Sequence, residues 1–275
     1  MPVKILAFDL DYTLLNSKKV IPPENIDALR YANERGAYIV PATGRIYRGI
    51  PDELRFLPFM RYFITANGSY IYDAVEDRAP ARAEIPLQEA LDFFSFCDTI
   101  DALYDCYQDN WGFMGEEMLA EASRVIPDPG IRKLIVTLRT PVPELKQYLR
   151  EKGENLQKLQ LYFTDMELRA RMLRELPERF PDMSVSSSVP FNIEINAKTA
   201  TKGHALETLC GLLGLDRGES MALGDGTNDL DMLVRAGVGV AMANADPKLL
   251  DAADYVTGSN NEAGFAKAIE KFVLG

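Results

Sequence analysis

A single histidine, His204, is present among the 275 residues of the chain. A catalytic Ser–His–Asp or Cys–His group would have to use this residue, and a metal site built from several histidines is excluded. If the chain is an enzyme, its working groups are therefore expected to be carboxylates and lysines. We expect His204 itself to lie on a helix surface without a chemical role.

Cysteines and long apolar runs are also scarce. The three cysteines, Cys97, Cys106 and Cys210, are odd in number and lack CxxC spacing. Neither a disulfide framework nor a structural zinc site is expected, and a reducing compartment is favoured. The start of the chain lacks the pattern of a secretory signal peptide. No apolar stretch approaches the ~18 residues that a membrane span needs. We therefore expect a soluble, cytoplasmic protein.

Positive charge is in the minority, with 30 lysines and arginines against 41 acidic residues and a net charge of −11. Nucleic acids and anionic membranes bind to basic surfaces, so neither is an expected partner. A small anionic substrate stays open, because a bound cation can reverse the sign of a local site. The sequence does not decide between a monomer and a homodimer.

The order of strand and helix patterns predicts an α/β fold that is interrupted by an insertion. Residues 1–82 alternate strand and helix signals, which is typical of a parallel sheet. Residues 83–195 read as a separate α+β domain, and residues 196–275 return to the first pattern. Within this scheme we expect a strand, an Asn–Gly turn and a second strand over residues 62–73. We also expect a helix over residues 46–57 and a strand over residues 131–139.

Chemically useful side chains follow several of the predicted strands. They are Asp9 and Asp11, the run Thr43–Gly44–Arg45, Lys202 at the start of a helix, and the loop Asp225–Gly226–Thr227–Asn228–Asp229. Open α/β sheets place their active sites at the carboxyl ends of the strands. Taken singly, each stretch has a structural explanation as a cap, a turn or a solvated lysine. The loop at 225–229 matches neither an EF-hand nor a dinucleotide-binding fingerprint.

Taken together, these residues suit a divalent cation and a phosphoryl group. Magnesium prefers oxygen ligands and keeps several waters, so one or two carboxylates are enough to bind it. A phosphoryl group needs a cation, directed donors and a nucleophile in line with the leaving oxygen. An aspartate can be that nucleophile. Because Asp9 and Asp11 lie on the same side of an extended chain, one can attack while the other exchanges a proton.

The segments DLDYTLL, ATGR, TKGHAL and GDGTNDLDML resemble, in this order, the four motifs of the haloacid dehalogenase (HAD) superfamily. The segment TANGSYIYD and the large insertion resemble its Cof-type branch, subfamily IIB. The resemblance implies a Rossmann-like core, residues 1–82 and 196–275, and a mobile α+β cap, residues 83–195. The cap would close over the site and select the substrate.

The resemblance also implies roles for individual residues. Asp9 would be the nucleophile, Asp11 the general acid and base, and Lys202 a bridge between Asp9 and the phosphoryl group. Mg²⁺ would be the cofactor. The implied phosphoryl- and substrate-binding residues are Leu10, Thr43, Gly44, Arg45, Lys202 and Asn228. The implied metal site consists of Asp9, Asp11 through its carbonyl, Asp225, Asn228 and Asp229.

Several further positions have a weaker signal. Tyr12 stands where many relatives have Gly or Asp, and it could affect specificity or pack in the core. Asn192 and Glu194 could contact the leaving group, although solvated strand residues are the simpler interpretation. The remaining candidates are Asn67–Gly68, read as a tight turn with a possible role near phosphate, and Tyr107, Trp111 and Phe113, read as cap core.

The leading hypothesis is a magnesium-dependent phosphatase for a small phosphorylated metabolite, such as a sugar phosphate, acting through an aspartyl-phosphate. A phosphomutase on the same scaffold is an alternative, and assaying for an isomerised product would separate the two. A non-catalytic binding or regulatory protein is a further alternative, although such proteins usually lose the nucleophile or the metal-binding acids. A dehalogenase is disfavoured because Asp11 has no place in its chemistry.

Overall fold

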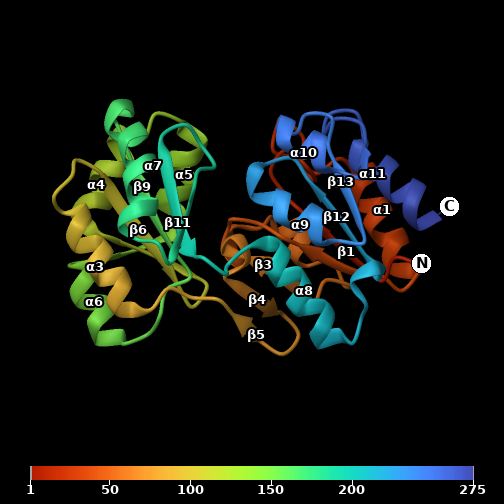
Figure 1. Cartoon of the computed structure of the whole chain (residues 1–275), viewed down its shortest axis with the longest axis horizontal. Helices are drawn as coiled ribbons and strands as arrows, with labels where there is room; N and C mark the ends of the chain where they lie inside the picture. The colour runs from red at the N-terminus through yellow and green to blue at the C-terminus, as the bar shows by residue number, and fades with distance from the viewer. Residues whose placement is uncertain (1, 275) are drawn as a thin grey trace. The chain divides into compact units, whose positions relative to one another are not determined.

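The computed structural model describes residues 2–274, and its contacts divide the chain into two compact units (Figure 1). The core unit comprises the residues up to 44, residues 51–81 and the residues from 201 on. The cap unit comprises residues 45–50 and 82–200. The domain boundaries predicted from the sequence, at 82/83 and 195/196, stay a prediction.

The core unit is built on a parallel sheet of five strands in the order β14-β13-β12-β1-β2. The strands are β1 (Ile5–Phe8), β2 (Tyr38–Pro41), β12 (Ser220–Gly224), β13 (Val238–Ala241) and β14 (Tyr255–Val256). Because all five run the same way, their carboxyl ends meet at one edge of the sheet. The predicted α/β class with a parallel sheet is therefore confirmed.

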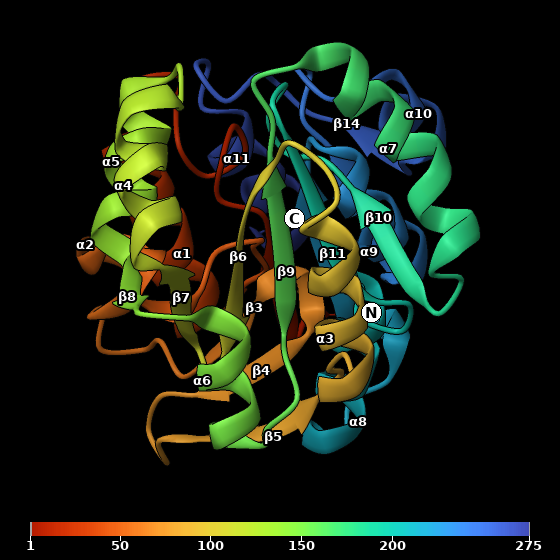
Figure 2. The same ribbon diagram turned by 90° about the vertical axis from the view of Figure 1, so that its left-hand side faces the viewer.

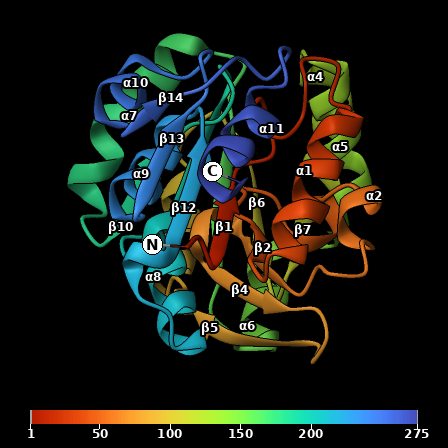
Figure 3. The same ribbon diagram turned by 90° about the vertical axis from the view of Figure 1, so that its right-hand side faces the viewer.

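Helices cover both faces of this sheet, which explains why β1 is apolar at every position. Side chains alternate between the faces, so Phe8 meets Phe265 with ring centroids 5.1 Å apart, while Ile5 and Ala7 pack with the other face's helices. Figure 3 shows these two helix layers around β1. One layer is α1 (Pro23–Glu34) with α11 (Gly264–Ile269) and the π-helical turn Glu270–Leu274; the other is α8 (Lys202–Leu213), α9 (Leu230–Arg235) and α10 (Pro247–Ala252).

A small antiparallel sheet in the core unit contains β3 (Tyr62–Thr65), β4 (Tyr70–Asp73) and β5 (Arg78–Arg82). The expected Asn–Gly turn joins β3 and β4 as a 3₁₀ turn, Ala66–Gly68. Gly68 has a φ of +101°, and a Cβ there would lie 2.2 Å from the carbonyl oxygen of Thr201. Only glycine allows this approach, so the turn sets the position of the start of α8.

The helix predicted over residues 46–57 is wrong as a single element. The structure has a 3₁₀ turn, Tyr47–Gly49, and a separate short helix α2, Asp52–Arg55. Ile50 and Pro51 between them have extended ψ angles of 136°. Proline disfavours helical conformation in the residue before it, which explains the break.

The cap unit contains a six-stranded sheet in the order β10-β11-β9-β6-β7-β8. Helices α3 (Leu87–Cys97), α6 (Leu145–Lys152) and α7 (Met166–Arg179) cover one face of it (Figure 2). Neighbouring strands are antiparallel except for β7 and β8. The strands are β6 (Leu103–Gln108), β7 (Trp111–Gly115), β8 (Arg139–Val142), β9 (Lys158–Tyr162), β10 (Met183–Ser186) and β11 (Asn192–Ala197).

The strand predicted over residues 131–139 is also wrong, because most of this segment is helix. Two helices, α4 (Glu116–Val125) and α5 (Pro129–Leu138), precede the short strand β8. The Asp128 carboxylate caps α5 by accepting the Ile131 N–H at 2.8 Å, and Pro129 occupies the first turn. The β-branched residues suggested a strand, but these start signals and the burial of Ile135 favour the helix.

Within residues 2–274, no helix has the length and apolar character needed to cross a membrane.

Candidate functional site

Three aspartates meet at the carboxyl edge of the core sheet. Asp9 follows β1 directly, Asp225 follows β12, and Asp229 closes the 3₁₀ turn Thr227–Asp229. Because β1 and β12 are adjacent parallel strands paired through Phe8 and Leu223, their ends bring the first two carboxylates together. One oxygen from each of the three aspartates lies within 4.8 Å of the others.

Lys202 completes this cluster from the first residue of α8. Its side chain is fully buried, and its Nζ lies 2.5 Å from Oδ1 of Asp9 and 2.6 Å from Oδ1 of Asp229. Thr201 caps the helix by accepting the His204 N–H. Since Gly68 packs against the Thr201 carbonyl, the turn after β3 helps to hold the lysine in place.

The cluster contains more acidic than basic side chains, and it is shielded from solvent. Burial raises the pKa of Asp9 well above its usual value, and the nearby Asp229 and Asp225 raise it further against the opposing effect of Lys202. Burial likewise raises the pKa of Asp225 to about 7, although the Thr13 hydroxyl, which donates to Oδ1 at 2.6 Å, opposes the shift. Burial alone would lower the pKa of Lys202, but Asp229 and Asp9 raise it instead.

These groups fit a divalent cation. Three carboxylates and one ammonium leave two negative charges, and carboxylate oxygens are the ligands that Mg²⁺ prefers. The second oxygen of Asp229 accepts the N–H groups of Asp225 at 3.0 Å and Gly226 at 2.9 Å. With its other oxygen on Lys202, Asp229 orients the loop and the lysine, whereas Asp9 and Asp225 have carboxylate oxygens with fewer protein contacts.

Asp11 lies beside the cluster in a more open setting. Its side chain is 34% exposed, and its carboxylate forms an ion pair with Lys19 at 2.9 Å. The Lys19 ammonium also lies 3.7 Å from the ring centroid of Tyr12, whose φ is +64°. The ring of Tyr12 is 47% exposed, so the expected alternative of core packing is wrong for this residue.

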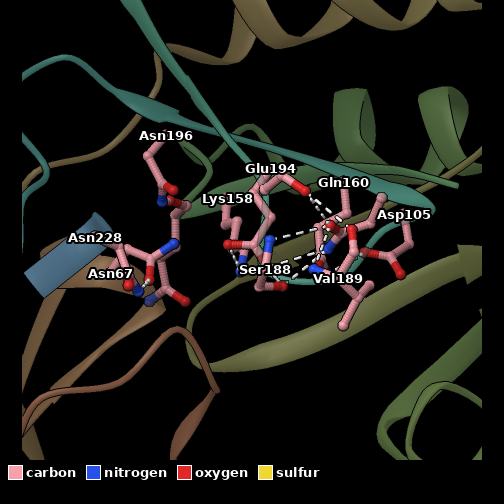
Figure 4. A network of polar contacts seen from close by, with 12 residues as sticks. Asn67, Asp105, Lys158, Gln160, Ser188, Val189, Glu194, Asn196 and Asn228 are labelled. Atoms are coloured by element: carbon pink, nitrogen blue, oxygen red, sulfur yellow. Dashed lines mark hydrogen bonds and ion pairs between the residues drawn. The ribbon is translucent and has the colours of Figure 1, made fainter. Parts of the chain in front are cut away.

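The predicted phosphoryl-binding residues lie in the core unit, except for Arg45. The N–H of Thr43 donates to the Ile64 carbonyl at 2.9 Å, and its own carbonyl accepts the Asn67 N–H at 3.0 Å. Asn228 Nδ2 donates to Asn67 Oδ1 at 3.3 Å, which links the third strand's turn to the acidic loop (Figure 4). Leu10 is buried, and its carbonyl accepts the Leu15 N–H.

Arg45 belongs to the cap unit, where its Nη1 donates to the Gly49 carbonyl at 2.7 Å. Gly44 is the last residue of the core unit before this segment. His204 is exposed on α8, as expected, with its Nδ1 3.4 Å from the Thr201 hydroxyl. Thr13 was missed by sequence reasoning, although its place four residues after the first aspartate of DLDYT was a signal for contact with the site.

The cap sheet has a buried polar network on the face away from α3 and α7. Asp105 accepts hydrogen bonds from Arg139 Nε at 2.7 Å, Tyr162 at 2.9 Å and Gln160 at 2.9 Å. Lys158 forms a buried ion pair with Glu194 at 2.8 Å. Figure 4 shows this network running across three neighbouring strands. Alternating polar residues in LYDCYQ, KLQLY and NIEINA were the signal for this face.

The burial of individual residues corrects two expectations for the cap. Asn192 and Glu194 are buried, at 3% and 5% exposure, so the interpretation as solvated strand residues is wrong. Tyr107 is buried and Phe113 packs on Tyr148 with centroids 4.8 Å apart, as expected for cap core. Trp111 is 41% exposed and is not part of that core.

Comparison with known proteins places this geometry in a family. Residues 6–269 match the family model of the haloacid dehalogenase-like hydrolases. The chain is 33% identical to a putative phosphatase of Bacillus subtilis strain 168, YxeH, with 98% of each chain covered. It is 31% identical to the same organism's 5-amino-6-(5-phospho-D-ribitylamino)uracil phosphatase YcsE, over 99% of this chain and 96% of that one. A HAD subclass IIB sugar phosphatase of known structure, BT4131, matches with a TM-score of 0.79 at 25% identity, covering 98% of this chain and 99% of that one.

The chain therefore belongs to the haloacid dehalogenase-like hydrolase family. Within that family it is a Cof-type, subclass IIB member and a phosphoric monoester hydrolase. The class of enzyme predicted from the four motifs is confirmed.

Proposed function

We propose that the protein is a magnesium-dependent phosphatase that hydrolyses a small phosphorylated metabolite through an aspartyl-phosphate on Asp9. One observation supports this above all others. A fully buried lysine lies 2.5 and 2.6 Å from two of three clustered aspartates, which leaves the cluster in need of a cation. Such a site binds an anionic phosphoryl group only together with a metal ion.

In the first step the Asp9 carboxylate attacks phosphorus and the P–O bond to the leaving alcohol breaks. Asp11 gives its proton to the leaving oxygen, which departs as a neutral alcohol. Lys202 holds the nucleophile's carboxylate in orientation and offsets charge on the transferring group. The partial exposure of Asp11 suits this role, because the water that returns the proton in the second step must reach this carboxylate from solvent.

In the second step water hydrolyses the aspartyl-phosphate. Asp11, now ionised, takes the proton of the attacking water, and the acyl-phosphate bond breaks to release phosphate and regenerate Asp9. We assign Thr43, Gly44, Asn228, Lys202 and the Leu10 backbone to the binding of phosphoryl oxygens.

Mg²⁺ would be held by Asp9, Asp225, the Asp11 carbonyl and Asn228, with Asp229 supporting it from outside. The ion would neutralise the charge that develops on the phosphoryl oxygens. The raised pKa values of Asp9 and Asp225 support this assignment, since a cation is what would favour their ionised forms.

We further propose a hydroxylated, sugar-like leaving group that the cap unit selects. Two relatives with full-length matches carry names for phosphates of a ribityl compound and of sugars. A polar sheet face with anchored carboxylate and ammonium groups has the chemistry to bind hydroxyl groups. A reducing, cytoplasmic location agrees with the three free, buried cysteines.

Hydrolysis of p-nitrophenyl phosphate with Mg²⁺ or EDTA tests the proposal. We expect turnover by the wild type only with Mg²⁺, loss of turnover in Asp9→Asn, and normal turnover in Asp251→Asn, which removes an exposed carboxylate on α10. A panel of sugar phosphates then ranks the leaving groups. Turnover that persists in Asp9→Asn would contradict the nucleophile, and an isomerised sugar phosphate as product would identify a mutase.

A further inference from the structure

Residues 45–50 are a segment of the cap unit that is enclosed in the sequence by residues of the core unit. By their contacts, residues up to 44 and residues 51–81 belong to the core unit, whereas these six residues group with residues 82–200. We call this stretch the 45–50 segment. It follows Thr43 and Gly44 directly, and the proposed function assigns phosphoryl binding to these two residues.

The 45–50 segment is attached to the rest of the cap through Tyr47, Arg48 and Gly49. The Tyr47 N–H donates to Asn110 Oδ1 at 2.9 Å. The Arg48 guanidinium lies over the indole of Trp111, 3.4 Å from the ring centroid. At Gly49 the backbone approaches α5 so closely that a Cβ would lie 3.1 Å from Leu138. An arginine stacked on tryptophan is the most favourable of the cation–π pairs.

The partner of the segment is the tip of the β6–β7 hairpin, which is held by strand pairing and by a hydrogen bond to Gln157. Gln108 pairs with Trp111, so Asp109 and Asn110 form a two-residue turn, with φ angles of +45° and +63°. The Asn110 N–H donates to the side chain of Gln157 at 3.0 Å. The backbone and the side chain of Asn110 are therefore both held, and its carboxamide presents a fixed acceptor to Tyr47.

Thr43, which precedes Gly44 and the 45–50 segment, is held by hydrogen bonds within the core unit. Thr43 is 1% exposed; its N–H donates to the carbonyl of Ile64 in β3, and its carbonyl accepts the N–H of Asn67 in the turn after β3. Between Thr43 in the core and the 45–50 segment in the cap there is only Gly44. The shortest covalent path from the contacts of the segment to Thr43 is therefore the backbone of Gly44.

We propose that Asn110 and Trp111 are positioning residues for phosphoryl binding, which act through the 45–50 segment on Thr43 and Gly44. This inference rests on the proposed function. Its consequence is reciprocal: a phosphate ion at Thr43 and Gly44 alters the Arg48–Trp111 contact, and weakening the hairpin contacts weakens phosphate binding by the same factor. The coupling needs no residue of the hairpin to touch the substrate.

The chain contains a single tryptophan, so Trp111 reports on this contact by its own fluorescence. With Mg²⁺ present, we expect inorganic phosphate to change the emission of the wild type, with a midpoint equal to its inhibition constant for p-nitrophenyl phosphate hydrolysis. In Arg48→Met the emission change is lost and the inhibition constant rises about threefold to tenfold. The rise in KM exceeds the fall in kcat, and Arg48→Lys restores most of the affinity.

A matched control removes an equivalent stack elsewhere in the cap. The Arg179 guanidinium lies over the Phe96 ring at 4.3 Å, away from the 45–50 segment in the sequence and in its contacts. Arg179→Met should lower the melting temperature as much as Arg48→Met does. It should leave the phosphate inhibition constant and the emission response as in the wild type.

A second pair of variants removes the hydrogen bond without a threat to folding. Asn110→Gly keeps a residue suited to positive φ, so the melting temperature holds or rises while the acceptor for Tyr47 is lost. Asn110→Asp keeps an acceptor oxygen at the same place. We expect the phosphate inhibition constant to rise in the glycine variant and to return toward the wild-type value in the aspartate variant.

The possible outcomes distinguish a failure of this inference from a failure of the proposed function. A wild type that neither turns over p-nitrophenyl phosphate with Mg²⁺ nor is inhibited by phosphate would overturn both. An active, phosphate-inhibited wild type whose tryptophan emission ignores phosphate would overturn the coupling alone. The coupling would equally fail if Arg48→Met and Asn110→Gly matched Arg179→Met in their phosphate inhibition constants.

Discussion

Substitution of Asp225 by asparagine should stabilise the metal-free protein at pH 8 and should remove its stabilisation by Mg²⁺. The carboxylate is largely buried beside Asp229 and Asp9, and burial is the main reason that its pKa lies at about 7 instead of 3.8. The asparagine keeps an oxygen for the Thr13 hydroxyl, which donates at 2.6 Å. The variant therefore loses the charge and retains the hydrogen bond.

The magnitude follows from the shift in pKa. For an isolated group, a change from 3.8 to about 7 corresponds to ~4 kcal/mol of unfolding free energy lost at high pH. Because Asp9, whose pKa is also raised by burial, stays in the cluster and is coupled to Asp225, the removal of one charge should recover about half of this, ~2 kcal/mol. For a protein of this size we expect the melting temperature in EDTA to rise by about 5 °C.

The gain should depend on pH with a definite sign. A group whose folded pKa is raised stabilises the fold fully below its unfolded pKa of 3.8, and this contribution is lost as the pH rises through about 7. Wild-type Asp225 is thus neutral in the fold at pH 5 and costs much less there. The advantage of Asp225→Asn should shrink by more than half between pH 8 and pH 5.

Thermal unfolding in EDTA and in Mg²⁺ at both pH values measures these effects. Mg²⁺ should raise the melting temperature of the wild type and of Asp251→Asn, but not that of Asp225→Asn, which lacks a ligand. The order of stability of wild type and variant should therefore reverse on addition of the metal. A variant that is less stable than the wild type in EDTA at pH 8, with the same difference at pH 5, would refute the reasoning.

Three further predictions follow from particular contacts. Lys202→Met removes the cation that lies 2.5 Å from Asp9, so turnover should fall more than about a hundredfold. Because the cluster then has one positive charge fewer, Mg²⁺ should bind at least about threefold more tightly in calorimetric titration, and weaker metal binding would contradict the charge argument. Gly68→Ala should lower the free energy of unfolding in urea by about 3 kcal/mol or more, because its Cβ would lie 2.2 Å from the carbonyl oxygen of Thr201. Gly36→Ala is the control: φ is +86° there but no atom lies within 4 Å of the added Cβ, so the loss should be only about 1 kcal/mol. Equal losses would exclude the clash. Arg139→Met should cost about 3–5 kcal/mol by leaving the Asp105 charge buried alone, and the double variant with Asp105→Asn should recover most of this; no recovery would show that packing, not charge, dominates.

The core unit could be predicted from the sequence because its signals are local and repeated. Strands such as Ile5–Phe8 are apolar at every position, and the helix after them begins at Pro23 and ends beside Gly36. The site followed from the same pattern, since parallel neighbours bring their carboxyl ends together whatever lies between them in sequence. The strand Tyr255–Val256 was not predicted, because two residues are too few to show an alternation of apolar and polar side chains.

The errors in the cap have a physical cause in competing signals. The segment 131–139 has β-branched residues typical of a strand, but the Asp128 cap and Pro129 initiate a helix. Glu194 was expected in solvent because it alternates with apolar residues along its strand. That alternation distinguishes the two faces of a sheet, but it does not indicate whether the polar face is buried by other elements. In this cap the polar face is buried, and the Lys158 ammonium forms an ion pair with the Glu194 carboxylate.

The same limit explains why the 45–50 segment was misread as part of a helix. Its conformation depends on Asn110 and Trp111, which lie more than 60 residues further along the chain, as the contact between Tyr47 and Asn110 shows. Local propensity favoured continuing the pattern through Pro51, whereas the observed turn is the form that places Tyr47 and Arg48 on the hairpin. A segment whose shape is set by distant contacts is suited to transmit a change in those contacts. In this chain that segment adjoins Gly44, a proposed phosphoryl-binding residue, so local prediction fails beside one of the places where the chain passes from one unit to the other.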